Sequence, residues 1–125
     1  MKKIEKTLKK NKMKLIRIFF LCITAILILI GCDNQKEFVS EDWKQWTESE
    51  NSPGLRWQMH KDLLSNYNLK TYNKDQILKL LGKPNIEEEN EYHYLLGYSG
   101  KGINTGKMIV VFKNDLVVDI KIIEG

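Results

Sequence analysis

The distribution of apolar residues divides the chain into three regions. Residues 18–30 contain no charged residue and a single polar residue, Thr24. Residues 33–51 are mostly polar or charged, and their sizeable apolar residues are Phe38, Val39, Trp43 and Trp46. From residue 52 onward, apolar residues recur first with the period of a helix and then with that of a strand. This pattern predicts an N-terminal apolar segment, a flexible polar tether over residues 32–51 and one folded domain over residues 52–125.

A first helix is predicted at the start of the folded domain. Leu55, Met59 and Leu63 recur every fourth residue, which is the spacing of one helical face. Ser52 is a suitable cap, because its hydroxyl can accept a hydrogen bond from a free backbone N–H of the first turn. The first helix is therefore placed at residues 54–66.

A second helix has signals at both of its ends. Asn73 and Gln76 have the spacing of a capping box, in which each side chain bonds to the other's backbone N–H. Gly82 can adopt the left-handed conformation that ends a helix, and Pro84 blocks its continuation. The second helix is therefore placed at residues 73–81.

Three strands are predicted after the helices, over residues 91–98, 108–112 and 116–123, with a glycine-rich loop at 99–106. Alternation in the first strand places on one face Tyr92, Tyr94, Leu96 and Tyr98. Alternation in the third strand places toward the core Leu116, Val118, Ile120 and Ile122. The predicted fold class is α+β, with two helices packed on a three-stranded antiparallel sheet (ααβββ).

Two runs within residues 70–123 resemble a known family. The first extends from Asn73 to Pro84 and ends in Leu-Leu-Gly-Lys-Pro, and the second extends from Val111 to Val117. With the aromatic strand between them, these runs resemble the small lipoproteins of the BamE (SmpA/OmlA) type and the repeat of the secreted β-lactamase inhibitor protein. The resemblance implies the ααβββ fold for the folded domain. The chain departs from the family pattern at Thr71-Tyr72-Asn73 and in its additional first helix.

The apolar segment ends in a motif that resembles the lipobox of bacterial lipoproteins, Leu29-Ile30-Gly31-Cys32. Eight basic residues and one acidic residue precede the segment, and such positive charge is retained on the cytoplasmic side of a membrane. The segment is shorter than the roughly 20 residues of a comfortable membrane span, but it suits a signal-peptide core. The resemblance implies a signal peptide over residues 1–31, cleavage between Gly31 and Cys32, and a lipid on Cys32. An uncleaved anchor helix is the alternative, and Met13 begins a second plausible signal.

Cleavage would change the charge of the protein. The full chain has 20 basic and 16 acidic residues, a net charge of +4, whereas 12 basic and 15 acidic residues follow the signal peptide, a net charge of −3. Nucleic acid requires a basic binding face, so no nucleic-acid partner is predicted. Cys22 would leave with the signal peptide and Cys32 would carry lipid, so no thiol remains for a disulfide, a metal or a nucleophile.

No catalytic group is predicted from the histidines or the glycine-rich loop. His60 is predicted on a helix and His93 on a strand, with no cysteine near either, and both are interpreted as structural. The run from Gly97 to Gly102 lacks the spacing of a phosphate-binding loop, and Ser99 has no base at a fixed spacing. We therefore expect no enzyme activity and no cofactor.

An acidic run precedes the first predicted strand, at Glu87, Glu88, Glu89 and Glu91. A weak cation site is conceivable there, but the spacing of a calcium-binding loop is absent. The run is therefore interpreted as a solvated loop, and no metal site is predicted.

Two tryptophans in the predicted tether are candidate contacts for a protein partner. Trp43 and Trp46 stand three residues apart, so one face of a helical turn would carry both. Tryptophan is over-represented at the residues that dominate binding energy in interfaces. Docking of both rings on the domain or at the lipid interface is the favoured interpretation, and contact with a partner is the alternative.

Two classes of function fit these features. The favoured class is a non-enzymatic protein-binding or scaffold module of the cell envelope, bound to the lipid bilayer through Cys32 on the extracytoplasmic side. The alternative is an inhibitor or immunity lipoprotein that blocks one specific enzyme or toxin, with Tyr92, Tyr94 or Tyr98 as contacts if they are not core residues. Asp33 after the lipidated cysteine indicates the inner membrane if the cell has two membranes.

Overall fold

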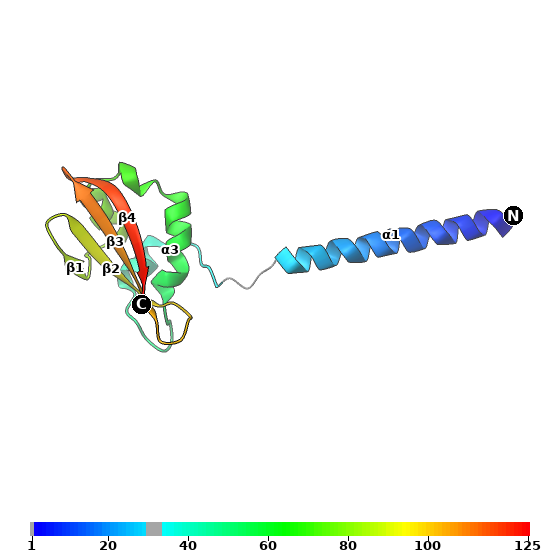
Figure 1. The fold of residues 1–125 in the computed structure, drawn as a ribbon, viewed down its shortest axis with the longest axis horizontal. Coiled ribbons are helices and arrows are strands. Elements are labelled where there is room, and N and C mark those ends of the chain that lie inside the picture. The colour runs from blue at the N-terminus through cyan, green and yellow to red at the C-terminus, as the bar shows by residue number, and fades with distance from the viewer. Residues whose placement is uncertain (1, 30–33) are drawn as a thin grey trace. The chain divides into compact units, whose positions relative to one another are not determined.

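The computed structural model describes residues 2–29 and 34–125, which form two compact units (Figure 1). The first unit contains the helix α1, Lys2–Leu29, and the second extends from Asn34 to Gly125. Figure 1 draws both units without determining how they are placed relative to each other. The second unit is referred to below as the domain.

The α1 helix has an exposed apolar surface. Between Ile16 and Leu21 every large apolar side chain is at least 46% exposed. No helix in the described part of the chain is both long and apolar enough to cross a membrane. The predicted cleavage and lipidation sites at Gly31 and Cys32, and the neighbouring Asp33, lie outside the described residues.

The domain is built on a four-stranded antiparallel sheet. The strands follow one another in chain order: β1 (Ile86–Glu87), β2 (Glu91–Tyr98), β3 (Thr105–Lys113) and β4 (Leu116–Glu124). The predicted α+β class is confirmed, but the predicted number of three strands is wrong. The additional strand is β1, whose two residues pair with His93 and Tyr92 and are too few to show an alternating pattern.

β3 begins earlier than predicted because a glycine belongs to the strand. Gly106, which was expected in the loop, pairs with Gly97 on β2 and with Glu124 on β4. The ring of Trp57 packs over Gly106 so closely that a Cβ atom at this position would collide with it. A glycine inside a strand often marks such a close approach.

A β-bulge reverses part of the orientation predicted for β4. The register shifts between Val111 and Phe112, so that Val118 has no partner on β3. Val117 is 3% exposed, whereas Leu116 is 51% and Val118 is 47% exposed. The prediction that Leu116 and Val118 face the core is therefore wrong, because the extra residue of the bulge breaks the alternation of faces.

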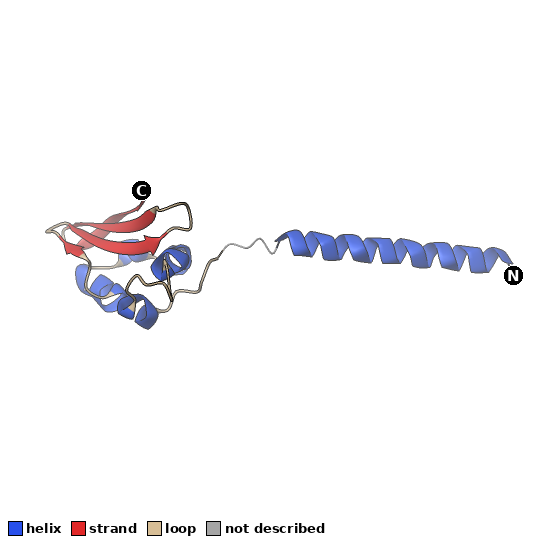
Figure 2. Cartoon of the chain, turned by 90° about the horizontal axis from the view of Figure 1, so that it is seen from below, coloured by secondary structure: helices blue, strands red, loops and turns tan. Residues whose placement is uncertain are grey.

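The helices of the domain lie on one side of the sheet and leave its other face open (Figure 2). They are α2 (Ser40–Gln45), α3 (Leu55–Asn66), the 3₁₀ turn η1 (Leu69–Thr71) and α4 (Lys74–Leu81). α3 and α4 correspond to the two predicted helices, whereas α2 and η1 were not predicted. The prediction of two helices is therefore incomplete.

The helix caps follow the prediction at α4 but not at α3. In α4 the Asn73 side chain accepts a hydrogen bond from the backbone N–H of Gln76 at 2.9 Å, and the Gln76 side chain accepts one from Asn73 N at 2.9 Å. The predicted capping box is thus confirmed. At α3 the cap position is Gly54, with φ of +61°, and not Ser52.

Residues 34–51 belong to the domain, which differs from the predicted tether. Phe38 is 6% exposed and Trp43 is completely buried. The backbone is held as well, since Lys36 N donates to Gln58 O at 2.9 Å and Phe38 N donates to Asp62 Oδ2 at 2.7 Å. The prediction of a tether relied on the average polarity of this segment, whereas its few large apolar residues stand at positions where they join the core.

The core lies between the helices and the covered face of the sheet. Its buried members are Phe38, Trp43, Met59, Leu63, Leu69, Ile77, Leu81, Tyr92, Tyr94, Leu96, Met108, Val110, Phe112 and Val117. Tyr92 and Tyr94 are therefore core residues, and of the three tyrosines named as candidate inhibitor contacts only Tyr98 is exposed, at 39%.

Candidate functional site

The two tryptophans that the sequence analysis singled out have different environments. Trp43 on α2 is completely buried and packs against Phe38 and Tyr94, so it offers no surface to a partner. The prediction that Trp43 contacts a partner is therefore wrong, because its ring is buried in the core. Trp46 follows the end of α2, is half-buried, and donates from Nε1 to Ser52 O at 2.8 Å.

A buried arginine lies between these two tryptophans. Arg56, in the first turn of α3, is 6% exposed. Its guanidinium carbon is 5.3 Å from the ring centroid of Trp43 and 5.5 Å from that of Trp46. Such an arrangement places the cation near the negative faces of two aromatic rings.

The hydrogen bonds of Arg56 connect α3 to α2 and to the sheet. Nε donates to Trp43 O at 2.9 Å, and Nη1 donates to Leu95 O at 3.2 Å and to Asn85 Oδ1 at 3.3 Å. Leu95 lies where the register of β2 shifts, and the Asn85 side chain also accepts from Leu95 N at 2.9 Å. Arg56 therefore donates hydrogen bonds to carbonyl oxygens near the end of α2 and at this bulge, which is a structural role.

Arg56 has no carboxylate partner among the described residues. Burial lowers the pKa of its guanidinium from the ordinary value, and the nearby Tyr94 opposes this effect. The group nevertheless keeps its charge at neutral pH, since an arginine is effectively always protonated. A buried positive charge is thus balanced by ring faces and carbonyl dipoles, without an anion.

The guanidinium borders a pocket of about 320 Å³. The pocket is lined by residues from five segments that are distant in the sequence: Trp46, Thr47, Glu48, Arg56, Asn85, Leu95, Gly97, Thr105 and Gly106. Trp46 packs so closely on Gly97 that a Cβ atom there would collide with its ring. The glycine therefore allows the tryptophan to form one wall of the pocket.

Sequence reasoning missed Arg56 as a site residue. The signal that could have found it is the buried stripe of α3, which consists of Arg56, Met59, His60 and Leu63. These positions have the i, i+3, i+4, i+7 spacing of a core-facing stripe. Two polar residues in such a stripe indicate a buried polar arrangement, and the pocket lies beside the first of them.

The other polar residue of this stripe, His60, is structural. His60 is 5% exposed, its ring centroid is 4.6 Å from that of Trp57, and its Nδ1 contacts Trp57 O. Burial lowers the pKa of His60, the hydrogen bond to Trp57 opposes this, and the charge of Lys61 adds to the lowering. In the described part of the chain His60 has no hydrogen bond to a serine, threonine or cysteine side chain that it could activate as a base.

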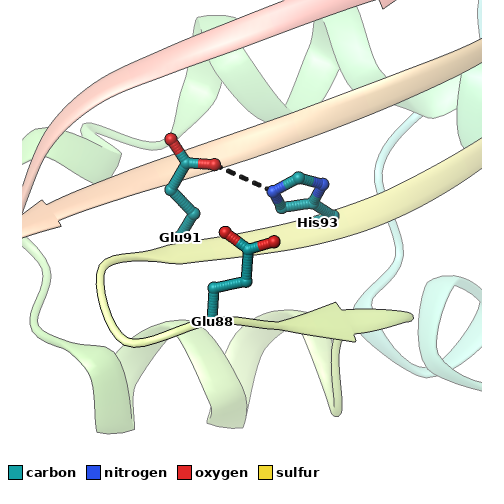
Figure 3. Close-up of side chains that lie close together, drawn as sticks. All are labelled: Glu88, Glu91 and His93. Atoms are coloured by element: carbon teal, nitrogen blue, oxygen red, sulfur yellow. Dashed lines mark hydrogen bonds and ion pairs between the residues drawn. The ribbon is translucent and has the colours of Figure 1, made fainter.

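Glu88, Glu91 and His93 form a cluster at the β1–β2 hairpin (Figure 3). Glu91 and His93 are two residues apart on β2 and so share a face, and Glu88 follows β1. One potential ligand atom from each side chain lies within 4.8 Å of the others, and His93 Nε2 is 2.9 Å from Glu91 Oε2. The prediction of a solvated loop for these glutamates did not include their proximity to His93.

The surroundings of His93 fit a hydrogen bond better than a metal ligand. His93 is 8% exposed, and its Nδ1 is buried without a hydrogen-bond partner among the described residues. A metal on Nε2 would require the proton on Nδ1, where the usual outer acceptor of a metal-bound histidine is missing. With the proton on Nε2, the ring donates to Glu91 and leaves only a lone pair at Nδ1.

Ser99 and the glycine-rich loop have a structural arrangement. Ser99 Oγ donates to Glu124 Oε1 at 2.8 Å and to Asn104 O at 3.2 Å, so it joins the loop to the end of β4. Gly100 and Gly102 have positive φ angles, as a tight loop between two strands requires. Among the described residues these contacts connect Ser99 to a carboxylate and a carbonyl oxygen, not to an imidazole.

Comparison with protein-family models, with curated proteins and with solved structures found no match to this chain.

Proposed function

We propose that the chain is a bacterial lipoprotein, anchored through Cys32 on the extracytoplasmic face of a membrane, whose domain is a non-enzymatic protein-binding module. The observation that carries this proposal is the order of three features along the chain. A basic and then apolar segment ends at Leu29-Ile30-Gly31-Cys32, and a folded domain begins at Asn34. A lipid on Cys32 would therefore hold the domain at the membrane after the preceding segment is removed.

The structure of α1 is compatible with a signal segment. Its large apolar side chains between Ile4 and Ile23 are exposed, and exposed apolar surface of this extent needs an apolar environment such as a membrane. The helix carries its basic residues, with the exception of Arg17, within residues 2–14, ahead of the uncharged segment. This arrangement supports insertion with the basic end retained on the cytoplasmic side.

Binding rather than catalysis is supported by the polar groups of the domain. The hydrogen bonds described for His60, His93 and Ser99 connect each of them to backbone carbonyls or to a carboxylate. None of these described hydrogen bonds pairs a hydroxyl or a thiol with an imidazole, the pairing that activates many serine and cysteine nucleophiles. The open face of the sheet, in contrast, carries half-exposed aliphatic residues, among them Ile86, Leu95 and Ile123, which a partner could cover.

The BamE-like ααβββ family remains part of this proposal. The order of two helices and three strands, α3, α4, β2, β3, β4, supports the proposal at the level of the fold, although α3 is the helix in which the chain departs from the family pattern. α2 and β1 are additions to that plan. A shared fold gives only an expectation about function, so the role of the domain must be tested directly.

The anchor is tested by labelling cells with an alkyne-bearing fatty acid and comparing the wild type with Cys32→Ala. We expect label and membrane association in the wild type, and loss of both in Cys32→Ala. Cys22→Ala is the matched control, because Cys22 lies inside the apolar segment and should not accept lipid. Equal labelling of the wild type and Cys32→Ala would contradict the proposed anchor.

The binding role is tested by crosslinking and pull-down of the tagged lipoprotein from its own cells, followed by mass spectrometry. Enrichment of a membrane-protein complex is the expected result and supports a scaffold. Enrichment of one soluble hydrolase or toxin would support the inhibitor or immunity class instead. Recovery of nothing above the level of Cys32→Ala would contradict a membrane-bound protein partner.

A further inference from the structure

The guanidinium of Arg56 has an unused donor group at the pocket. Its Nε and Nη1 atoms make three hydrogen bonds, whereas Nη2 has no partner among the described residues. The buried side-chain atoms without a partner in the described part are Trp43 Nε1 and His93 Nδ1. Nη2 of Arg56 is therefore not a fully buried atom, and Arg56 lines the pocket.

Arg56 also has no ion-pair partner in the described part of the chain. Burial of a charged group is costly unless an opposite charge accompanies it. Arg56 is 6% exposed and forms no ion pair with a described carboxylate. An anion that entered the pocket would supply both the missing charge and an acceptor for Nη2.

The pocket holds the guanidinium in a fixed orientation. Trp43 and Trp46 lie near the cation, and the carbonyl groups of Trp43 and Leu95 fix two of its nitrogen atoms. A donor that is already oriented loses little freedom when it binds, which favours a specific ligand. The volume of about 320 Å³ is at the lower end of the usual range for small-molecule sites.

The walls indicate which anion fits. Glu48 lines the same pocket, and its two carboxylate oxygens accept from Gly54 N at 2.9 Å and from Tyr98 N at 2.8 Å. Because Arg56 and Glu48 together leave the pocket without net charge, a singly charged carboxylate meets less repulsion there than a divalent phosphate. Trp46 provides apolar surface for a group attached to that carboxylate.

We infer that the pocket beside Arg56 binds a carboxylate that is attached to an apolar or aromatic group. Such a ligand is available from the carboxyl terminus of a peptide chain and from an acidic side chain next to an apolar residue. Nη2 of Arg56 donates to the carboxylate, and the apolar group packs against Trp46. The inference rests on the proposed binding function, since it names the chemistry by which the domain recognises its partner.

The direct test is NMR titration of the full chain in detergent micelles with phenylacetate and with phenylacetamide. The two probes have nearly the same shape, but only the first carries a negative charge. We expect phenylacetate to shift the Arg56 side-chain N–H and the Trp46 indole N–H saturably, with at least about tenfold tighter binding than phenylacetamide, because only phenylacetate forms an ion pair with the guanidinium. Equal binding of the two probes, or no binding of either, would overturn the inference.

Variants separate the pocket from the structural role of Arg56. Thr47 is exposed and lines the pocket, so Thr47→Trp should fill it without entering the core. Thr71 is exposed on η1 and is not a pocket residue, so Thr71→Trp is the matched control. Phenylacetate should fail to bind Thr47→Trp and should bind Thr71→Trp as it binds the wild type. Unchanged binding by a folded Thr47→Trp protein would show that the ligand sits elsewhere; if that variant does not fold, Thr105→Trp serves the same purpose.

Peptides then identify the source of the carboxylate. One peptide ends in Gly-Phe with a free carboxylate, the second is the same peptide with an amidated end, and the third is amidated and carries an internal Glu-Phe pair. Binding of the first alone assigns the site to chain ends, and binding of the third assigns it to acidic side chains. A failed titration combined with a successful pull-down would reject only the carboxylate site and leave the proposed binding function in place.

Discussion

Arg56 and His60 occupy positions on α3 that helical periodicity reserves for apolar residues. The first is 6% and the second 5% exposed, and each makes a hydrogen bond to a backbone carbonyl, of Trp43 and Trp57 respectively. Such bonds make burial of polar groups tolerable, because an unpaired buried donor is far more costly. Individual residues that break the apolar pattern therefore mark the part of the helix where the pocket is built.

Protonation of His60 is expected to destabilise the domain. Burial lowers the pKa of His60 below its ordinary value of 6.5, so below that pH the unfolded state binds more protons than the folded state. The free energy of unfolding should be highest above pH 6.5 and should decrease as the pH falls below it. Urea denaturation across this pH range measures the decrease, which His60→Gln should make smaller. Identical pH dependence in the wild type and in His60→Gln would contradict this role of the imidazole.

At the scale of elements, those with strong local signals were predicted and those that depend on distant partners were not. α4 was predicted at both ends, because its capping box and its terminal glycine lie within or beside the helix. α2 has six residues and no side-chain cap, so its existence depends on the burial of Trp43 against the rest of the domain. β1 exists through its pairing with β2, and the bulge in β4 becomes visible only when β3 is placed beside it.

The candidate site, like α2 and β1, depends on residues that are distant in the sequence. Its pocket joins the end of α2, the first turn of α3, the residues before β1, the bulge of β2 and the beginning of β3. No spacing within one segment reveals such a site, because the residues meet only through the fold. The part that the sequence could have indicated is the arginine in the apolar stripe of α3.

The segment that contains α2 is expected to contribute strongly to stability. Phe38 is 6% exposed and makes edge contacts with Trp43 and Tyr67, with ring centroids 5.7 and 5.3 Å apart. Phe38→Ala should lower the free energy of unfolding by about 3 kcal/mol, as for other buried aromatic residues. Val39→Ala is the matched control, since Val39 is 43% exposed and should change stability by less than about 0.5 kcal/mol. Equal effects of the two substitutions in urea denaturation would indicate that the segment is a loose tether after all.

At the scale of the whole molecule, the early start of the domain shortens the connection to the proposed anchor. The domain begins at Asn34, two residues after Cys32, and Lys36 N already donates to Gln58 O. A chain of two residues spans at most about 7 Å. If Cys32 carries lipid, the domain must lie close to the bilayer surface, and its partner must be reachable there. A flexible tether over residues 32–51, as predicted, would instead have allowed the domain to bind a partner farther from the membrane.

This organisation also predicts where the chain can be shortened. The core of the domain is formed by residues from Phe38 onward, so a protein that lacks residues 1–31 should unfold with a free energy within about 0.5 kcal/mol of the full chain. Removal of residues 1–39 deletes Phe38 and the backbone hydrogen bond of Lys36, and should cost about 3 kcal/mol or more. Urea denaturation of both truncated proteins and the full chain, in the same detergent, measures the difference. A large loss already on removal of residues 1–31 would mean that the domain needs α1 to fold, and α1 could then not be a segment that is removed from the working protein.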